Sequence, residues 1–127
     1  MFKLLRALVL LLPFLTTGSS FAADTAFDAA RFDALNKQGK PILVAIHADW
    51  CPTCRAQAPI VSGLLKTPEL KEITAFRVDF DDQKDAVRRF RASTQSTLIV
   101  FKGGKEVGRS IGDTRQEGIA ALLRKAI

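Results

Sequence analysis

Both cysteines of this chain lie three positions apart, directly after an apolar run. Residues 42–46 are aliphatic, and Cys51, Pro52, Thr53 and Cys54 follow them. Such a run predicts a buried strand, and a proline after the first cysteine suits the first turn of a helix, where its missing N–H is not needed. Two thiols with this spacing can close a small disulfide ring and reopen it without moving the fold. The segment therefore predicts a strand followed by a helix, with a two-electron switch between them.

The two thiols are expected to have different roles. Cys51 would lie at the helix N-terminus, where unpaired backbone N–H groups and the positive end of the helix dipole favour the thiolate. We therefore expect Cys51 to be the nucleophile and Cys54 to be the resolving thiol. Pro52 is compatible with the helix start, and Thr53 adds only a small polar side chain.

A structural zinc site and an inert disulfide are the alternatives for this pair. Tetrahedral zinc takes four ligands, usually Cys or His, and the chain offers only His47 besides Cys51 and Cys54. An inert disulfide usually closes a long loop, and a ring this small gains little entropy. We therefore expect redox chemistry by the thiols themselves, with no metal and no other cofactor.

The N-terminal segment has the pattern of a secretory signal peptide. Two basic residues precede an apolar stretch over residues 7–15, and small and polar residues follow over 16–23. The apolar stretch is shorter than the about 20 residues that a membrane-spanning helix needs, so an uncleaved membrane anchor is the less favoured alternative. Cleavage after Ala22 predicts a signal peptide over residues 1–22. The pattern is similar to a bacterial export signal, so we expect the mature protein in a periplasm.

The remaining residues, 23–127, are enough for one domain with a single core, and we expect a monomer. Loss of the two basic residues of the signal lowers the formal charge from +6 to +4. The densest basic cluster, Arg88, Arg89 and Arg91, flanks Phe90 without an aromatic platform or a nucleic-acid motif. We therefore expect a solvated helix face there and no nucleic-acid partner.

Helical and strand patterns alternate along this domain, with glycine and proline between them. The first half is expected to contain a helix over 27–37 capped by Asp28, a strand over 41–47 and a helix over 51–65 kinked at Pro59. A strand over 75–80 and a helix opened by Asp81 or Asp82 are expected next. The last part is expected to contain a strand over 97–101, a tight turn at Gly103 and Gly104, a strand over 106–111, and a helix opened by a capping box of Thr114 and Glu117.

This order predicts an α/β fold in which helices cover both faces of a central mixed β-sheet. At this point the chain resembles the thioredoxin family over nearly all of the mature domain. The run 48–51 is also similar to the C-terminal thioredoxin-like domain of the periplasmic thiol-disulfide interchange reductase. The residues that carry the family resemblance are the segment 40–59, with Trp50, Cys51, Cys54 and Pro59 in the expected places, and then Asp81, 97–101, Gly104 and Gly112.

Two strand positions depart from the family pattern near the thiols. The resemblance implies a buried acidic residue that helps to deprotonate the resolving cysteine, but Ala45 stands at that position. His47 replaces a residue that is often aromatic, and strand alternation puts it on the face of Ala45, so proton exchange with Cys54 is one interpretation. The interpretation that we favour, because no charged partner for the ring is evident, is that His47 packs beside Trp50 with one nitrogen satisfied.

Ser96 is a third departure. It aligns with the family's cis-proline, the residue that faces the disulfide and helps to present a substrate backbone. A cis bond before a residue other than proline costs about 2.5–4 kcal/mol, so we expect a trans Gln95–Ser96 bond and a differently placed loop. Ser96 either donates a hydrogen bond to a thiolate or is a loop residue with no chemical role.

Two further side chains are expected near the thiols. Arg77 lies where the family often has a lysine, and we expect it to face solvent or to pair with Asp79 or Asp81, without a catalytic role. Trp50 is expected to shield the disulfide and to offer an apolar docking surface, with simple core packing as the alternative.

Together these residues predict a periplasmic thiol-disulfide oxidoreductase that reduces disulfide-bonded client proteins. The resemblance implies a membrane thiol-electron transporter as the reductant, with cytochrome maturation factors or damaged exported proteins as clients. The reverse direction, a dithiol oxidase, uses the same residues. A soft-metal protein that holds copper through Cys51, Cys54 and His47 is the alternative from another class, because thiolates suit Cu(I).

Overall fold

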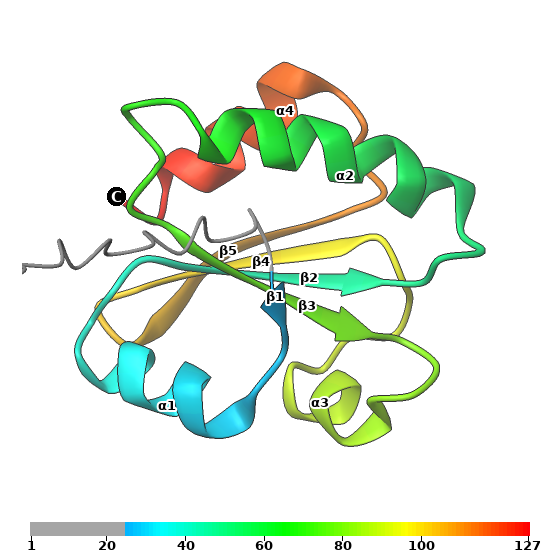
Figure 1. Cartoon of the computed structure of the whole chain (residues 1–127), viewed down its shortest axis with the longest axis horizontal. Coiled ribbons are helices and arrows are strands. Elements are labelled where there is room, and N and C mark those ends of the chain that lie inside the picture. The colour runs from blue at the N-terminus through cyan, green and yellow to red at the C-terminus, as the bar shows by residue number, and fades with distance from the viewer. Residues whose placement is uncertain (1–24) are drawn as a thin grey trace, which may run out of the picture.

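A five-stranded mixed sheet organises the structure, a computed structural model that describes residues 25–127 (Figure 1). In chain order the strands are β1 (Thr25–Ala26), β2 (Ile42–His47), β3 (Thr74–Asp79), β4 (Thr97–Lys102) and β5 (Lys105–Ile111). Their order in the sheet is β1-β3-β2-β4-β5. β3 pairs in parallel with β1 and β2, whereas β4 pairs antiparallel with β2 and β5.

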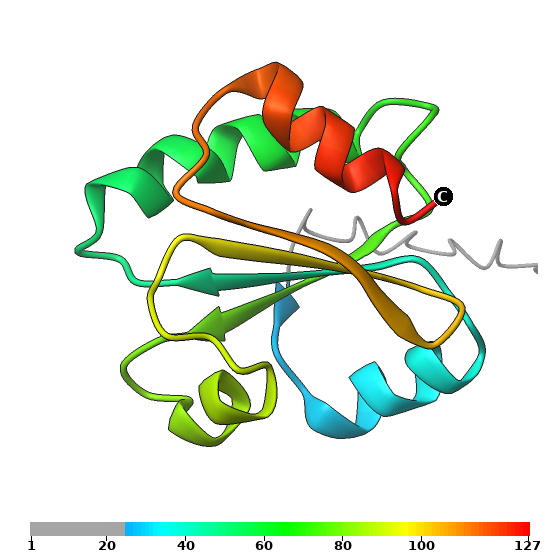
Figure 2. The same ribbon diagram turned by 180° about the vertical axis from the view of Figure 1, so that it is seen from behind.

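Helices cover both faces of this sheet, as the front and back views show (Figures 1 and 2). α1 (Ala29–Lys37) and α3 (Lys84–Arg89) lie on one face, and α2 (Pro52–Leu65) and α4 (Gln116–Arg124) lie on the other. The predicted α/β fold with a central mixed sheet is therefore confirmed. The helix after the cysteines has the predicted length and contains Pro59.

Each face of the sheet packs on its own apolar core because strand residues alternate between the two faces. Leu43 of β2 packs with Leu123 on the side of α2 and α4. Its neighbour Ile42 packs on the other side with Phe32, whose ring contacts that of Phe76 at a centroid distance of 6.1 Å. Burial on both faces fixes β2 in place, and β2 in turn sets where α2 begins.

The starts of α1 and α3 differ in how well the sequence predicted them. Asp28 caps α1 as expected, and its carboxylate accepts a hydrogen bond from the N–H of Arg31 at 2.7 Å. The predicted start of α3 at Asp81 or Asp82 is wrong. The Asp79 carboxylate accepts hydrogen bonds from both of their N–H groups, at 2.9 and 2.8 Å, and so closes a turn before α3 begins.

The predicted capping box of Thr114 and Glu117 is also wrong. α4 has Arg115 at its N-cap position, and no side chain makes a capping hydrogen bond there. The carboxylate of Asp113 instead accepts a hydrogen bond from the Arg115 N–H at 3.0 Å. Asp113 thus satisfies a backbone donor just before α4, and the helix begins one residue later than the predicted capping box would place it.

The hairpin between β4 and β5 has the predicted turn. Gly103 and Gly104 have φ angles of +60° and +82°, which a two-residue hairpin turn of this kind requires and which glycine adopts without steric cost. β1 was not predicted, because two residues are too few to produce a strand pattern. It adds an edge to the sheet beside β3.

The basic cluster lies on a solvated helix face, as the sequence predicted. Arg88 and Arg89 are exposed and form ion pairs with Asp85 and Asp33, respectively. The predicted signal peptide, residues 1–22, lies outside the described residues. No helix within residues 25–127 is long and apolar enough to span a membrane.

Candidate active site

The two thiols meet at the start of α2. Cys51 is the N-cap residue, and its sulfur accepts a hydrogen bond from the backbone N–H of Cys54 at 3.2 Å. Pro52 occupies the first helical turn, as predicted, and Thr53 follows it as a half-buried residue. Both cysteines are reduced, and only 2% of each is exposed. The strand before α2 and the core beneath it thus hold two thiols just under the surface.

Ser96 connects the two sulfurs. Its Oγ lies 3.1 Å from the Sγ of Cys51 and 3.1 Å from the Sγ of Cys54, and only 4% of the residue is exposed. The Ser96 hydroxyl is therefore within hydrogen-bonding distance of both thiols, the contact that the first interpretation of this residue expects. No cis peptide bond occurs among residues 25–127, so the predicted trans Gln95–Ser96 bond is confirmed.

The backbone of Ser96 is held in an uncommon conformation. Its φ is +64°, a left-handed value that costs a residue with a side chain roughly 1–3 kcal/mol. The Ser96 N–H donates to the carbonyl of Ile46 at 2.8 Å, and its carbonyl accepts from the N–H of Gly112 at 2.9 Å. The buried amide of Gln57 adds a third bond by donating from Nε2 to the same carbonyl at 3.2 Å. These contacts keep the hydroxyl aimed at the thiols.

Gln57 is a site residue that the sequence reasoning missed. Its Nε2 also donates to the carbonyl of Asp113 at 2.9 Å, so it joins the Ser96 loop to the segment before α4. A buried glutamine one turn after Cys54 was the only signal that could have pointed to it, because a buried amide needs hydrogen-bond partners.

The environment separates the pKa values of the two thiols. Burial alone raises the pKa of Cys51, but hydrogen bonds to its sulfur outweigh burial, so this pKa lies below its ordinary value. Burial also raises the pKa of Cys54, and the hydrogen bond that its thiol shares with Cys51 raises it further, above its ordinary value. In decreasing order of effect, the groups that lower the pKa of Cys51 are the Cys54 thiol, the Ser96 hydroxyl and the backbone N–H groups of Cys54 and Thr53.

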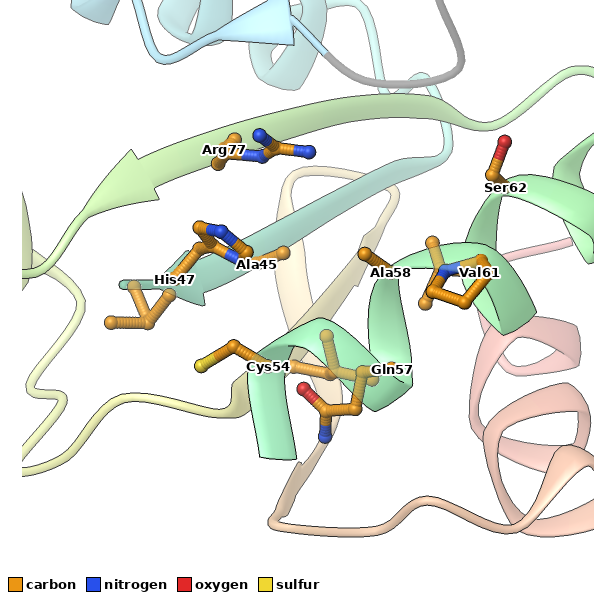
Figure 3. Close-up of a pocket in the computed structure, with 11 residues that line it drawn as sticks. Ala45, His47, Cys54, Gln57, Ala58, Val61, Ser62 and Arg77 are labelled. Carbon is orange, nitrogen blue, oxygen red and sulfur yellow. The ribbon is translucent and has the colours of Figure 1, made fainter. Parts of the chain in front are cut away.

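His47 has a charged partner, which corrects the sequence-based expectation. Its Nε2 lies 2.9 Å from the Oδ1 of Asp49, and its side chain is 13% exposed. His47 and Cys54 line one cavity of about 300 Å³ between β2, β3 and α2, together with Ala45 and Arg77 (Figure 3). The hydrogen bond to Asp49 satisfies one ring nitrogen, as the favoured interpretation of His47 expects, and the ring also shares a cavity with the Cys54 thiol.

Trp50 does not pack in the core, so that alternative is wrong. The residue is 59% exposed, and its Nε1–H donates to the Oδ2 of Asp81 at 2.6 Å. The indole therefore stands at the surface beside Cys51, tethered at its polar end. Arg77 is half-buried on the cavity wall rather than fully exposed to solvent.

Metal ligands are few around the thiols. Within residues 25–127, no three side chains of the His, Cys, Asp or Glu type cluster closely enough to hold a metal ion. The geometry provides a dithiol in which one sulfur is stabilised as a thiolate and the other retains its proton. A cavity adjoins Cys54, and an exposed indole precedes Cys51. A site of this kind performs thiol-disulfide exchange.

The fold and the site together define a thiol-disulfide oxidoreductase with a Cys-X-X-Cys motif formed by Cys51 and Cys54. Residues 23–125 match the thioredoxin family model, and the chain belongs to the thioredoxin family.

Relatives and solved structures agree with this assignment. The chain is 33% identical over 109 residues to the thioredoxin of Mycobacterium bovis, which covers 86% of this chain and 82% of that protein. It is 33% identical over 97 residues to the bifunctional thioredoxin reductase/thioredoxin of Mycobacterium leprae, where the match covers 76% of this chain but only 20% of that longer protein. The crystal structure of Trxlp from Edwardsiella tarda superposes with a TM-score of 0.77 at 39% identity, covering 79% of this chain and 97% of that one.

The hydrogen bond from Ser96 gives a direct prediction for the reactivity of Cys51. Removing the hydroxyl in Ser96→Ala should raise the pKa of Cys51 and so lower its thiolate fraction at pH 7. A hydrogen bond to a charged group contributes about 1.5–3 kcal/mol, so alkylation of Cys51 by iodoacetamide at pH 7 should become about tenfold slower.

The measurement is the alkylation rate as a function of pH. The inflection should move to higher pH in Ser96→Ala, while Ser93→Ala, which changes an exposed serine of the same loop, should leave it in place. An inflection at the same pH in the parent protein and in Ser96→Ala would contradict the assignment.

Proposed function

We propose that this protein is a periplasmic thiol-disulfide oxidoreductase that reduces disulfides in exported proteins, with Cys51 as the nucleophile and Cys54 as the resolving thiol. The observation that carries the assignment of roles is the position of Cys51 at the N-cap of α2, where its sulfur accepts the Cys54 N–H at 3.2 Å. The pKa of Cys51 is lowered and that of Cys54 is raised, in agreement with these roles. A thiolate attacks a disulfide, whereas a thiol does not, so the reaction begins at Cys51.

The reaction then has two exchanges. The Cys51 thiolate attacks one sulfur of the client disulfide, a mixed disulfide forms, and the other client sulfur leaves as a thiolate that takes up a proton. Cys54 loses its proton and attacks the Cys51 sulfur, which closes the Cys51–Cys54 disulfide and releases the second client sulfur. The client gains two electrons and two protons, and the protein is left oxidised.

Trp50 and Ser96 support the first exchange in this proposal. The exposed indole offers an apolar surface on which a client segment can dock next to Cys51. The Ser96 hydroxyl donates to the attacking thiolate, which increases the fraction of Cys51 that is ready to react. Pro52 and Thr53 place the two sulfurs by starting α2 and have no separate chemical step.

Two features support the periplasmic location and the source of electrons. The N-terminal residues have the pattern of a bacterial export signal, and the family match begins at residue 23, directly after the proposed cleavage site. The resemblance of residues 48–51 to the C-terminal domain of the periplasmic interchange reductase supports a membrane thiol-electron transporter as the donor that reduces the protein again. In this proposal the protein works as a monomer.

The dithiol oxidase is a second candidate function, and one observation favours it. Ser96 and the Cys54 N–H stabilise Cys51 in the reduced protein, and stabilisation of the reduced form makes a disulfide a stronger oxidant. The direction of electron flow therefore depends on how much this stabilisation raises the reduction potential.

Trapping of partners tests the proposed roles. In Cys54→Ala the second exchange cannot occur, so the purified protein should accumulate as a mixed disulfide with client proteins of a periplasmic extract, visible on a non-reducing gel. Cys51→Ala, the matched control, should form none and should lose disulfide reductase activity. Tight Cu(I) binding by the parent protein together with no trapped client would overturn the reductase function.

The reduction potential of the Cys51–Cys54 couple decides the direction. Because Ser96 stabilises the reduced form, we expect a potential above the roughly −270 mV of thioredoxin. If the Ser96 hydroxyl favours the reduced form about tenfold in the thiol-disulfide equilibrium, Ser96→Ala should make the potential about 30 mV more negative. Equilibration in glutathione buffers of defined ratio, followed by thiol labelling, measures both values. A potential of roughly −120 mV would contradict the proposed reductase and support the dithiol oxidase.

Export is tested separately from chemistry. Expression of the full chain in a bacterium with a periplasm should yield protein in the periplasmic fraction that begins at Ala23, as read by N-terminal sequencing. Removal of residues 1–22 should keep the protein in the cytoplasm. Periplasmic protein that still carries residue 1 would contradict cleavage of the signal peptide and support the uncleaved membrane anchor.

A further inference from the structure

The resolving thiol must lose a proton inside the protein. Cys54 is only 2% exposed, and burial holds its proton on the sulfur, so Cys54 needs a nearby acceptor before it can attack. Its sulfur lines the cavity of about 300 Å³ between the sheet and α2. A cavity of this size has room for water beside the thiol, since one water occupies about 30 Å³.

Only one side chain on the wall of this cavity can accept that proton near neutral pH. The polar lining groups besides Cys54 are His47, Gln57, Ser62 and Arg77. An amide and a hydroxyl are far too weak as bases, and a guanidinium has no lone pair to offer. Neutral imidazole is a base in this pH range, so His47 is the candidate. Figure 3 shows His47 on β2 and Cys54 on α2 facing the same cavity.

His47 also borders a second hollow, which shares Arg77 with the first, and this gives the proton a way out. This outer cleft has a volume of about 260 Å³ and is lined by His47, Asp49, Asp79 and Arg77 among others. The side chain of Asp49 is 92% exposed, so the cleft reaches solvent. His47 therefore lies between a buried thiol and an outer cleft that contains carboxylates.

Asp49 sets the tautomer of the ring. An ionised carboxylate only accepts hydrogen bonds, so the nitrogen that lies 2.9 Å from it, Nε2, must carry a hydrogen. In neutral His47 the lone pair is then on Nδ1, which is free to accept a proton. The charged groups that line the two hollows beside the ring are Asp49, Asp79 and Arg77.

We propose that His47, oriented by Asp49, relays the proton of Cys54 to solvent during resolution of the mixed disulfide. The Cys54 thiol passes its proton through a cavity water to Nδ1 of His47. The resulting thiolate attacks the Cys51 sulfur, the Cys51–Cys54 disulfide forms, and the client sulfur leaves as a thiolate. The imidazolium then gives its proton to water in the outer cleft. Asp49 is a positioning residue, because it acts only through the ring.

The test separates the two exchanges in time. Reduced protein mixed with an equimolar amount of dithiobis(nitrobenzoate) releases one thionitrobenzoate when Cys51 attacks and a second when Cys54 resolves the mixed disulfide. In His47→Gln the second release should be roughly 10- to 100-fold slower at pH 7, a factor at or just below the usual contribution of general base catalysis. The first release should change less than about twofold, because Cys51 does not depend on the relay. At alkaline pH, where Cys54 ionises without help, the second phases of parent and variant should converge.

Three variants make the result decisive. Asp49→Asn, a change at an exposed residue, should slow the second release by a smaller factor with the same convergence at alkaline pH. Ser62→Ala, which removes another polar group from the same cavity wall, should change neither phase. Equal second-phase rates in parent and His47→Gln at pH 7, or slowing by one factor at every pH, would overturn the relay. The inference rests on Cys54 as the resolving thiol, and a second release that persists in Cys54→Ala would refute that assignment instead.

Discussion

The hydrogen bonds to the Cys51 sulfur are the interactions on which the function of this fold depends. The Cys54 N–H reaches the sulfur from inside the first helical turn, at 3.2 Å, and the Ser96 hydroxyl reaches it from the loop before β4, at 3.1 Å. The first contact follows from the start of a helix, which leaves backbone donors unused. The second requires two segments 45 residues apart to meet. Both lower the pKa of a thiol that burial alone would keep protonated.

The position of Ser96 is maintained at a cost that the surrounding backbone offsets. A left-handed φ is unfavourable for serine, yet hydrogen bonds to Ile46, Gly112 and Gln57 hold the residue in place. Because Ile46 belongs to the central strand and Gln57 to the active-site helix, the loop is attached both to the helix that carries the thiols and to the strand that precedes it. Movement of the Ser96 backbone relative to the sulfurs would break several hydrogen bonds at once.

A second set of contacts lies on the side of Cys54 that faces the cavity. There Ala45 leaves space, His47 fills one wall, and Asp49 fixes the ring from the solvent side. The two thiols thus face different surroundings although they are three residues apart. Ser96 contacts both sulfurs, but the Cys54 N–H donates to Cys51, and a cavity with one basic side chain adjoins Cys54. This asymmetry is what lets one sulfur begin the exchange and the other complete it.

Local patterns in the sequence determined the elements and the chemistry class. The aliphatic run of β2, the cysteine spacing, the Asp28 cap and the Gly103–Gly104 turn each depend on residues within a few positions, so the strand, the helix starts and the redox motif could be predicted. The starts of α3 and α4 could not, because Asp79 and Asp113 bind nearby backbone N–H groups in turns before each helix, and both helices begin after the predicted cap. Tertiary structure alone decided that Ser96 meets both sulfurs, that Gln57 clamps its loop, and that His47 shares a cavity with Cys54. These are contacts between distant segments, and their geometry is set by packing of the whole sheet and its helices rather than by any local preference.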